Sequence, residues 1–283
     1  MLGCDGNRHA GLFTTLRLSY DFNDDSKIYQ ALRGSLLPWE AALTESERPD
    51  STYSPLYVHG EYLQKNPSWH VEDSPWKAAQ ILRGFALLSQ PPQTVCEIGC
   101  GAGEILRQLE LQMPSASTTE FVGYDISPQA IALARSRESL RTKFVLGDAK
   151  SDERHFDALL CIDVFEHIED YFSFLRTIRQ KADYFVFHIP LELNCEGLLR
   201  NFLMDTRGLY GHLHQFTRET ALAVLQECGY ILLGEFYTPS YECQPDNLHT
   251  RATKRIRKMV FAALPRLSVR LINGLHLMVV AKG

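Results

Sequence analysis

The sequence lacks any long apolar run. No stretch approaches the roughly 18 apolar residues of a membrane-spanning helix, and residues 1–20 lack the continuous apolar block of a secretory signal. Basic residues are not in excess either, because 34 acidic side chains outnumber 29 Lys and Arg and leave a net charge of -5. Since nucleic-acid binding usually requires a basic surface, we expect no nucleic-acid partner and a cytoplasmic location.

Common metal-binding and disulfide patterns are missing as well. The 7 cysteines include no C-x-x-C pair and the 10 histidines no H-x-x-x-H pair, which are spacings found in many zinc sites. Cys96, Cys100 and Cys161 lie in or beside apolar segments, where a free thiol behaves as a small hydrophobic side chain. We therefore predict reduced cysteines and no metal site.

The sequence does contain an alternation of strand-like and helix-like segments. Hydrophobic residues make up 45% of the 283 residues, which is ample for a core. Such alternation predicts an α/β fold, in which a parallel sheet is covered by helices on both faces. The predicted strands are 94–98, 120–124, 143–146, 157–162, 183–188, 230–237 and 275–281, and the predicted helices include 103–113, 128–140, 168–181 and 217–229.

Two unusual segments accompany this alternating region. Residues 1–73 are rich in aromatic side chains, are interrupted by prolines and predict an N-terminal cap or extension. A helix then begins at Ser74, with Pro75 at its first position, and we assign residues 74–283 to one domain. Within that domain, residues 246–273 mix basic and apolar side chains and predict a basic helical insertion.

The most informative segment is a strand that runs into a glycine-rich loop. The pattern is Glu97-x-Gly99-x-Gly101-x-Gly103. A strand, a glycine loop and a helix in this order let backbone N–H groups approach an extended ligand closely. A dinucleotide-binding loop would carry its third glycine at position 104, which is glutamate here. The pattern instead resembles the first motif of class I S-adenosylmethionine-dependent methyltransferases.

Further clusters resemble the same family. Asp125 ends the second predicted strand, where the family places a carboxylate on the cofactor's ribose diol. Asp148 follows the third strand, where an acidic residue accepts from the adenine amino group. Segment 156–170, which places Glu166 and His167 after the fourth strand, closely resembles that of the type-11 and type-23 methyltransferases.

The resemblance covers roughly residues 75–237 and the last strand. It implies a seven-stranded Rossmann-like sheet, mostly parallel with an antiparallel edge strand, and S-adenosylmethionine as the cofactor. The cofactor-binding residues that we predict are Glu97, Gly99, Cys100, Gly101, Gly103, Asp125, Ile126, Asp148, Ala149, Asp163 and Val164.

Four histidines are candidates for a catalytic base, because imidazole exchanges a proton near neutral pH. His167 follows the fourth strand and His188 ends the fifth, so both lie at the ligand edge of the sheet. His212 and His214 precede the helix at 217, and alternation places both on one side of an extended segment. Helix capping explains His167 equally well, and a satisfied core position explains His188. We name His167, His188 and His214 as candidate catalytic residues and His212 as a substrate contact.

The aromatic side chains of residues 53–76 predict a lid over the site. Trp69 and Trp76 would suit an apolar or ring-bearing acceptor, although packing of the cap explains them equally well. The basic stretch 246–273 can lie on an anionic membrane, but we favour a basic face that is simply solvated.

The predicted activity is methylation of a small molecule, with a hydroxyl as the first choice of acceptor because a histidine base suits it. One alternative is methylation of a sugar or of a lipid-linked intermediate at the membrane surface. Another is a regulatory protein that binds the cofactor without catalysis.

Overall fold

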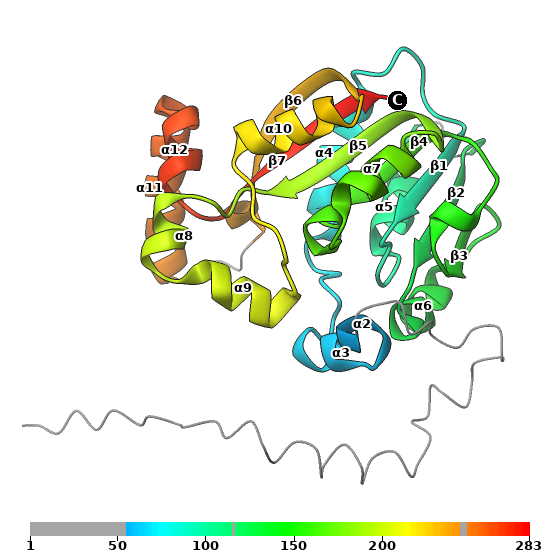
Figure 1. The fold of residues 1–283 in the computed structure, drawn as a ribbon, viewed down its shortest axis with the longest axis horizontal. Coiled ribbons are helices and arrows are strands. Elements are labelled where there is room, and N and C mark those ends of the chain that lie inside the picture. Colours follow the sequence, from blue (N-terminus) through cyan, green and yellow to red (C-terminus); the bar gives the residue numbers. More distant parts are fainter. Residues whose placement is uncertain (1–54, 115–116, 244–247) are drawn as a thin grey trace, which may run out of the picture. The chain divides into compact units, whose positions relative to one another are not determined.

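Seven strands form a mixed sheet in the computed structural model of the protein (Figure 1). The structure describes residues 55–114, 117–243 and 248–283, and these belong to one compact unit. The strands are β1 (Thr94–Ile98), β2 (Glu120–Asp125), β3 (Thr142–Leu146), β4 (Phe156–Ile162), β5 (Ala182–Pro190), β6 (Ile231–Pro239) and β7 (Leu275–Lys282). The sheet order is β3-β2-β1-β4-β5-β7-β6.

The strands from β3 to β5 are parallel, and the antiparallel pairing lies at one edge of the sheet. There β7 inserts between β5 and β6 and runs antiparallel to both. At the centre, Val95 of β1 pairs with Phe121 of β2 on one side and Ala158 of β4 on the other. Central parallel strands are covered on both faces and therefore consist of nearly continuous apolar runs. The predicted Rossmann-like methyltransferase fold is confirmed.

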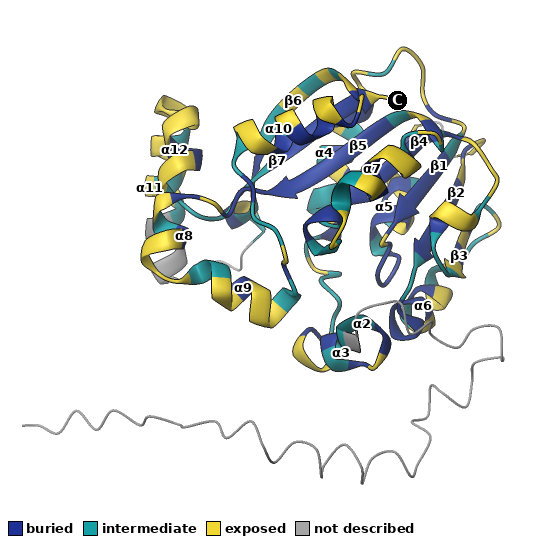
Figure 2. Cartoon of the chain, viewed as in Figure 1, coloured by how far each residue is buried: buried dark blue, intermediate teal, exposed yellow. Residues whose placement is uncertain are grey.

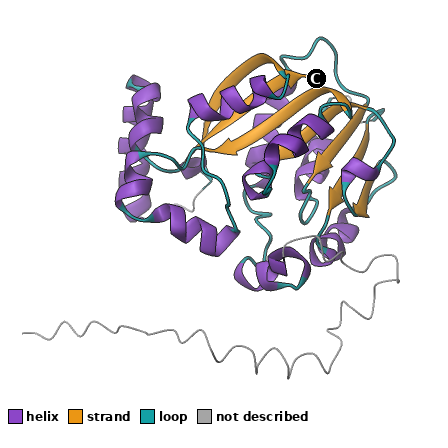
Figure 3. Ribbon diagram, in the orientation of Figure 1, coloured by secondary structure: helices purple, strands orange, loops and turns teal. Residues whose placement is uncertain are grey.

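Helices cover both faces of this sheet (Figure 3). Two hydrophobic clusters lie between the layers, one containing Ile81, Leu106, Leu109 and Phe121 and the other Leu159, Phe165, Phe185 and Phe187. Figure 2 shows the central strands buried and the outer helix surfaces exposed. The covering helices are α4 (Ser74–Phe85), α5 (Glu104–Gln112), α6 (Pro128–Ala134), α7 (Tyr171–Ile178) and α10 (Arg218–Glu227).

Local signals set several helix ends. The Ser127 side chain accepts from Ala130 N and caps α6, and Pro128 follows at its first turn. The Asp170 side chain accepts from Ser173 N, so α7 begins at Tyr171, three residues later than predicted. The predicted helix 128–140 ends early, because a short 3₁₀ turn follows α6.

Within the described residues, six further α-helices lie outside the regular alternation. The predicted basic insertion forms α11 (Leu248–Ala263) and α12 (Pro265–Leu271). The sequence did not predict α2 (Pro55–Val58), α3 (Glu61–Lys65), α8 (Cys195–Leu199) or α9 (Phe202–Tyr210). None of the described helices is both long and apolar enough to cross a bilayer.

Candidate active site

Two adjoining cavities lie at the carboxyl ends of the parallel strands, where open α/β sheets bind their ligands. Their volumes are about 520 and 710 Å³. Both are lined by residues of the glycine loop, of the segment after β4 and of the N-terminal segment. The residues common to the two cavities are Tyr62, Trp69, Gly99, Asp163 and His167.

The glycine loop has a backbone conformation that side chains disfavour. Gly99 and Gly101 have φ angles of 69° and 54°, in the left-handed region that favours glycine. A Cβ on Gly101 would lie 2.6 Å from Cδ1 of Trp69, and one on Gly99 would lie 2.8 Å from Cγ2 of Val164. Both glycines therefore leave room for neighbours that line the cavities.

Gly103 has a packing role at the start of α5. It precedes this helix with a φ of 78°, and a Cβ there would lie 2.4 Å from Cζ of Phe144 in the core. Gly103 lines neither cavity, and its contact with the cofactor stays a prediction.

Asp125 lies where the ribose carboxylate was predicted. Its Oδ2 accepts from Gly101 N at 2.8 Å and its Oδ1 from Ser127 N at 2.8 Å. Burial raises the pKa of Asp125 to about 6. Asp125 and Asp148 both line the larger cavity. The Asp148 carboxylate accepts a hydrogen bond from the backbone N of Lys150 and pairs with its Nζ. The predicted residues Ile126, Ala149 and Val164 also line this cavity.

Glu97 supplies a direct test of whether the site fits S-adenosylmethionine. The side chain is 1% exposed and lines the smaller cavity together with Cys100. Its Oε2 has no hydrogen-bond partner within the described residues, and burial raises its pKa well above the usual value. A buried acceptor of this kind needs a donor, which the ammonium of the cofactor's amino-acid portion provides. The glycine loop, Glu97 and Asp125 therefore fit the cofactor.

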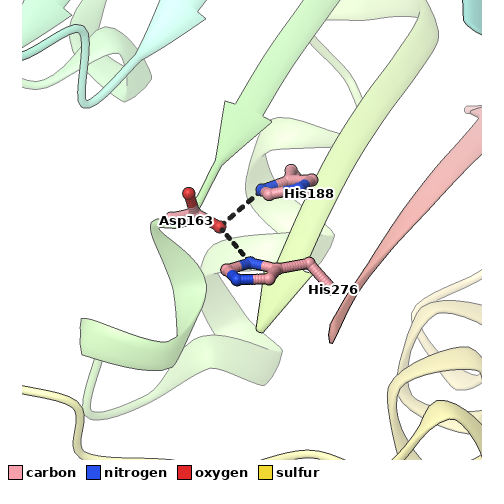
Figure 4. Close-up of side chains that lie close together, drawn as sticks. All are labelled: Asp163, His188 and His276. Carbon is pink, nitrogen blue, oxygen red and sulfur yellow. Dashed lines mark hydrogen bonds and ion pairs between the residues drawn. The ribbon is translucent and has the colours of Figure 1, made fainter. Parts of the chain in front are cut away.

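Asp163, at the end of β4, is the centre of a charged cluster. Its Oδ2 pairs with Lys77 Nζ at 3.0 Å, and Lys77 also pairs with Asp73 at 3.2 Å. Its Oδ1 lies 2.7 Å from His188 Nδ1 and 3.7 Å from His276 Nδ1 (Figure 4). Burial opposes ionisation of Asp163, but His188 and Lys77 outweigh it and hold its pKa well below the usual value.

His188 is fully engaged within this cluster. A carboxylate only accepts, so His188 Nδ1 donates to Asp163, and its Nε2 accepts from Thr238 Oγ1 at 2.9 Å. Burial lowers the pKa of His188, and its ring stacks on that of His276 with centroids 4.7 Å apart. The structure thus favours a satisfied core position over a catalytic base for His188.

His167 contacts Tyr57 through Nδ1, and its ring also contacts the backbone of Gly211. Its Nδ1 lies 2.8 Å from the Tyr57 hydroxyl, which donates to the carbonyl oxygen of Tyr210 at 3.0 Å. Burial, with a smaller effect of His212, lowers the pKa of His167 to about 4. The ring is therefore neutral at pH 7, and it lines both cavities.

Glu166 lies beside His167 as an unpartnered carboxyl group. It is fully buried, and neither of its oxygens has a hydrogen-bond partner within the described part of the chain. Its Oε1 lies 3.9 Å from His167 Nε2. Burial raises the pKa of Glu166 well above the usual value. Glu166 thus places an unpartnered buried carboxyl group in the wall of the smaller cavity.

His212 and His214 do not share one side of the chain as predicted. His212 lines the smaller cavity, and its Nδ1 lies 2.9 Å from Glu192 Oε2. His214 lines neither cavity, and its Nε2 lies 3.2 Å from the carbonyl oxygen of Glu169. The alternation is broken because the backbone N–H groups of residues 213 and 214 both donate to the carbonyl oxygen of Glu166. This placement argues against His214 as the base.

The N-terminal segment lines the cavities with residues other than its tryptophans as well. Trp69 lines both cavities, whereas Trp76 lines neither and its Nε1 donates to Glu242 Oε2 at 3.4 Å. Residues 53 and 54 of the predicted lid lie outside the described residues. Sequence reasoning placed Tyr57 among the lid aromatics but not as the partner of His167. It missed Lys77, for which the only local signal was the four-residue spacing from Asp73.

Two groups of side chains bring potential metal-ligand atoms within 4.8 Å of one another. They are Asp163 with His188 and His276, and Glu166 with His167 and His212. In the first group, Asp163 Oδ1 already bonds His188 Nδ1, while Lys77 pairs with the other oxygen of Asp163 and Thr238 bonds His188 Nε2. In the second, the oxygens of Glu166 remain available to an acceptor group or to a cation.

Comparisons with known proteins agree with this fold. A family model described as a methyltransferase domain, of type 23, matches residues 72–233, which is more than half of the chain. A comparison with curated proteins finds no significant match.

Solved structures share the fold at low sequence identity. A cyclopropane synthase from Mycobacterium tuberculosis is 17% identical with a TM-score of 0.52, over 72% of this chain and 83% of that one. A SAM-dependent methyltransferase from Archaeoglobus fulgidus is 18% identical with a TM-score of 0.50, over 74% and 94%. A Haemonchus contortus phosphoethanolamine N-methyltransferase in complex with S-adenosyl-L-methionine is 17% identical with a TM-score of 0.50, over 73% and 52%.

The family match, the sheet order and the fit of the glycine loop, Glu97 and Asp125 lead to one conclusion. This chain belongs to the methyltransferase domain family of class I enzymes that use S-adenosylmethionine.

Proposed function

We propose that this methyltransferase methylates a hydroxyl oxygen of a small-molecule acceptor, with neutral His167 as the general base. The hydrogen-bond chain from His167 Nδ1 through the Tyr57 hydroxyl to the Tyr210 carbonyl carries the proposal. A carbonyl oxygen only accepts, so the Tyr57 proton points to it and the Tyr57 oxygen accepts from Nδ1–H. His167 Nε2 then keeps its lone pair for a proton of the acceptor.

The surrounding residues support this role. When bound, S-adenosylmethionine supplies an electrophilic methyl group. His167 Nε2 takes the hydroxyl proton as the acceptor oxygen forms its new bond, and the unpartnered oxygens of Glu166 accept hydrogen bonds that orient the acceptor. Tyr62 and Trp69 cover the glycine loop and exclude water. Most of the rate enhancement in such a site comes from positioning the two reactants.

The test begins with a screen of small-molecule acceptors using methyl-labelled cofactor and mass spectrometry. On an acceptor found in this way, His167→Ala should lower kcat by roughly 10²–10⁴-fold and leave the Kd of S-adenosylhomocysteine unchanged. His214→Ala is the matched control, because His214 lies outside both cavities, and it should retain wild-type kcat.

Three outcomes would contradict the proposal. One is transfer of the label to nitrogen or carbon rather than oxygen. A second is a kcat that falls with decreasing pH at an apparent pKa near that of free histidine. The pKa of His167 is lowered to about 4, so such a profile would point to a different base. The third is loss of activity with a chelator and recovery with a divalent cation, which would make Glu166, His167 and His212 metal ligands instead.

A further inference from the structure

Helix α12 presents its leucines to solvent rather than to the core. Leu267 and Leu271 lie four residues apart on one face of the helix and are 47% and 43% exposed, and Leu264, the N-cap of the helix, is 54% exposed. The buried residues of this helix are Ser268 and Val269. Because an amphipathic helix that only covers a core buries its apolar stripe, this orientation indicates a binding surface.

Helix α11 continues the same pattern. Ile256 and Met259 are 62% and 71% exposed, and Val260 lies beside them on the same face. The inward residues are Phe261, which packs edge-on against Tyr237, and Arg257, which donates to the carbonyl oxygen of residue 273. Helices α11 and α12 pack against each other, with α8 beside α12 (Figures 1 and 2). We call the exposed apolar stripes of α11 and α12 the insertion surface.

The charge of the insertion surface has one sign. Residues 248–273 contain no Asp or Glu, although the whole chain has a net charge of -5. Arg255, Lys258 and Arg266 are exposed and form no ion pair within the described part of the chain. Apolar side chains bordered by cations are the combination that binds an anionic lipid surface, since the apolar groups enter the acyl boundary and the cations stay at the headgroups.

We propose that the insertion surface docks on a lipid bilayer that contains anionic lipids. A second copy of the chain fits this surface less well, because a twofold contact would place Arg255, Lys258 and Arg266 against their own copies. Nucleic acid would pair with the cations but leave the apolar stripe in water. This proposal departs from the expectation of a solvated basic face, because the apolar side chains are on the outer side of both helices.

Docking there has a consequence for the acceptor. Glu196, Arg200 and Arg257 line the smaller cavity from α8 and from the inner side of α11. The bilayer therefore lies about one helix diameter, roughly 10 Å, from the cavity wall. An acceptor held at the membrane surface is accordingly close to the wall of the smaller cavity, which His167 also lines.

The experiment measures sedimentation of the full-length protein with lipid vesicles and needs no catalytic activity. Vesicles of phosphatidylcholine with about 30% phosphatidylglycerol should bind the protein at least tenfold more tightly than phosphatidylcholine alone. The double variant Met259→Glu, Leu267→Glu should weaken this binding at least tenfold. Leu140→Glu is the control, because Leu140 is 92% exposed beside β3, at the opposite edge of the sheet, and its binding should match wild type.

A second variant separates charge from apolar contact. Replacing Arg255, Lys258 and Arg266 by Gln should weaken binding to anionic vesicles roughly fivefold for each cation removed, and high salt should act in the same direction. S-adenosylhomocysteine binding by every variant confirms that the fold is intact. Equal binding by wild type and the double Glu variant would overturn the proposal. So would a dimer that the double Glu variant dissociates, in a protein that binds neither kind of vesicle.

Discussion

Replacing Gly101 with alanine tests how closely the glycine loop, the cap and the cofactor are fitted together. Gly101 has a φ of 54°, and an added Cβ would lie 2.6 Å from Trp69 Cδ1 and 2.8 Å from Trp69 Nε1. Real Cβ atoms do not approach heavy atoms so closely, so the Trp69 ring has to move. Trp69 lines both cavities, and its displacement changes the wall that covers the cofactor.

The substitution is expected to change both the thermal stability of the protein and its affinity for S-adenosylhomocysteine. A left-handed φ costs a residue with a Cβ about 1–2 kcal/mol relative to glycine, and each kcal/mol lowers the Tm of a protein of this size by about 2–4 °C. Displacement of Trp69 adds to this cost. When the unliganded protein can relax this strain but the ligand-bound protein cannot, the strain opposes binding. Each 1.4 kcal/mol of strain that is present only in the bound state weakens ligand binding about tenfold. We therefore expect the Kd of S-adenosylhomocysteine to rise at least tenfold.

Calorimetric titration with S-adenosylhomocysteine and thermal unfolding measure these two effects. Gly208→Ala is the control, because Gly208 lies in α9 with no atom within 4 Å of an added Cβ, and it should leave the Kd unchanged. Trp69→Ala combined with Gly101→Ala removes the clash and keeps the backbone strain, so it should recover part of the lost Tm. A Gly101→Ala protein with wild-type Kd and Tm would refute the reasoning.

Three further predictions concern the charged and hydrogen-bonded groups. Lys77→Met leaves the partly exposed carboxylates of Asp163 and Asp73 without their shared cation and should lower the free energy of unfolding in urea by about 1–3 kcal/mol at neutral pH. The pKa of Asp163 is depressed in the folded state, so its ionised form stabilises the fold above the unfolded pKa, and this stabilisation is lost as the pH falls through the folded pKa. The difference in free energy of unfolding between the variant and wild type should therefore shrink in acid. Burial raises the pKa of Asp125 to about 6, so its carboxylate is mostly protonated at pH 5. Calorimetry should therefore show about tenfold weaker S-adenosylhomocysteine binding near pH 5 than near pH 7.5. An unchanged Kd would contradict the ribose role. Tyr57→Phe removes the acceptor for His167 Nδ1–H and should lower kcat about tenfold at constant cofactor affinity; an unaffected kcat would count against the orientation of His167.

The sequence by itself determined the fold and the cofactor half of the site. Each of the seven strands is a local run of apolar residues, and the predicted and observed strands agree to within about two residues. The glycine loop and Asp125 are equally local, because a glycine loop after one strand and a carboxylate at the end of the next meet at the same edge of a parallel sheet. Short-range patterns contain this information, so one chain was enough to predict it.

The tertiary structure alone decided which histidines face the site and which way the insertion is turned. Tyr57 and His167 are separated by 110 residues along the chain, and no local pattern marks either as the other's partner. Asp163 and Thr238, which come from two other segments, occupy both ring nitrogens of His188 and favour a core position for it over the role of a base. In α11 and α12 the periodicity shows an apolar stripe but not its direction, because direction depends on what the rest of the chain packs against the opposite face.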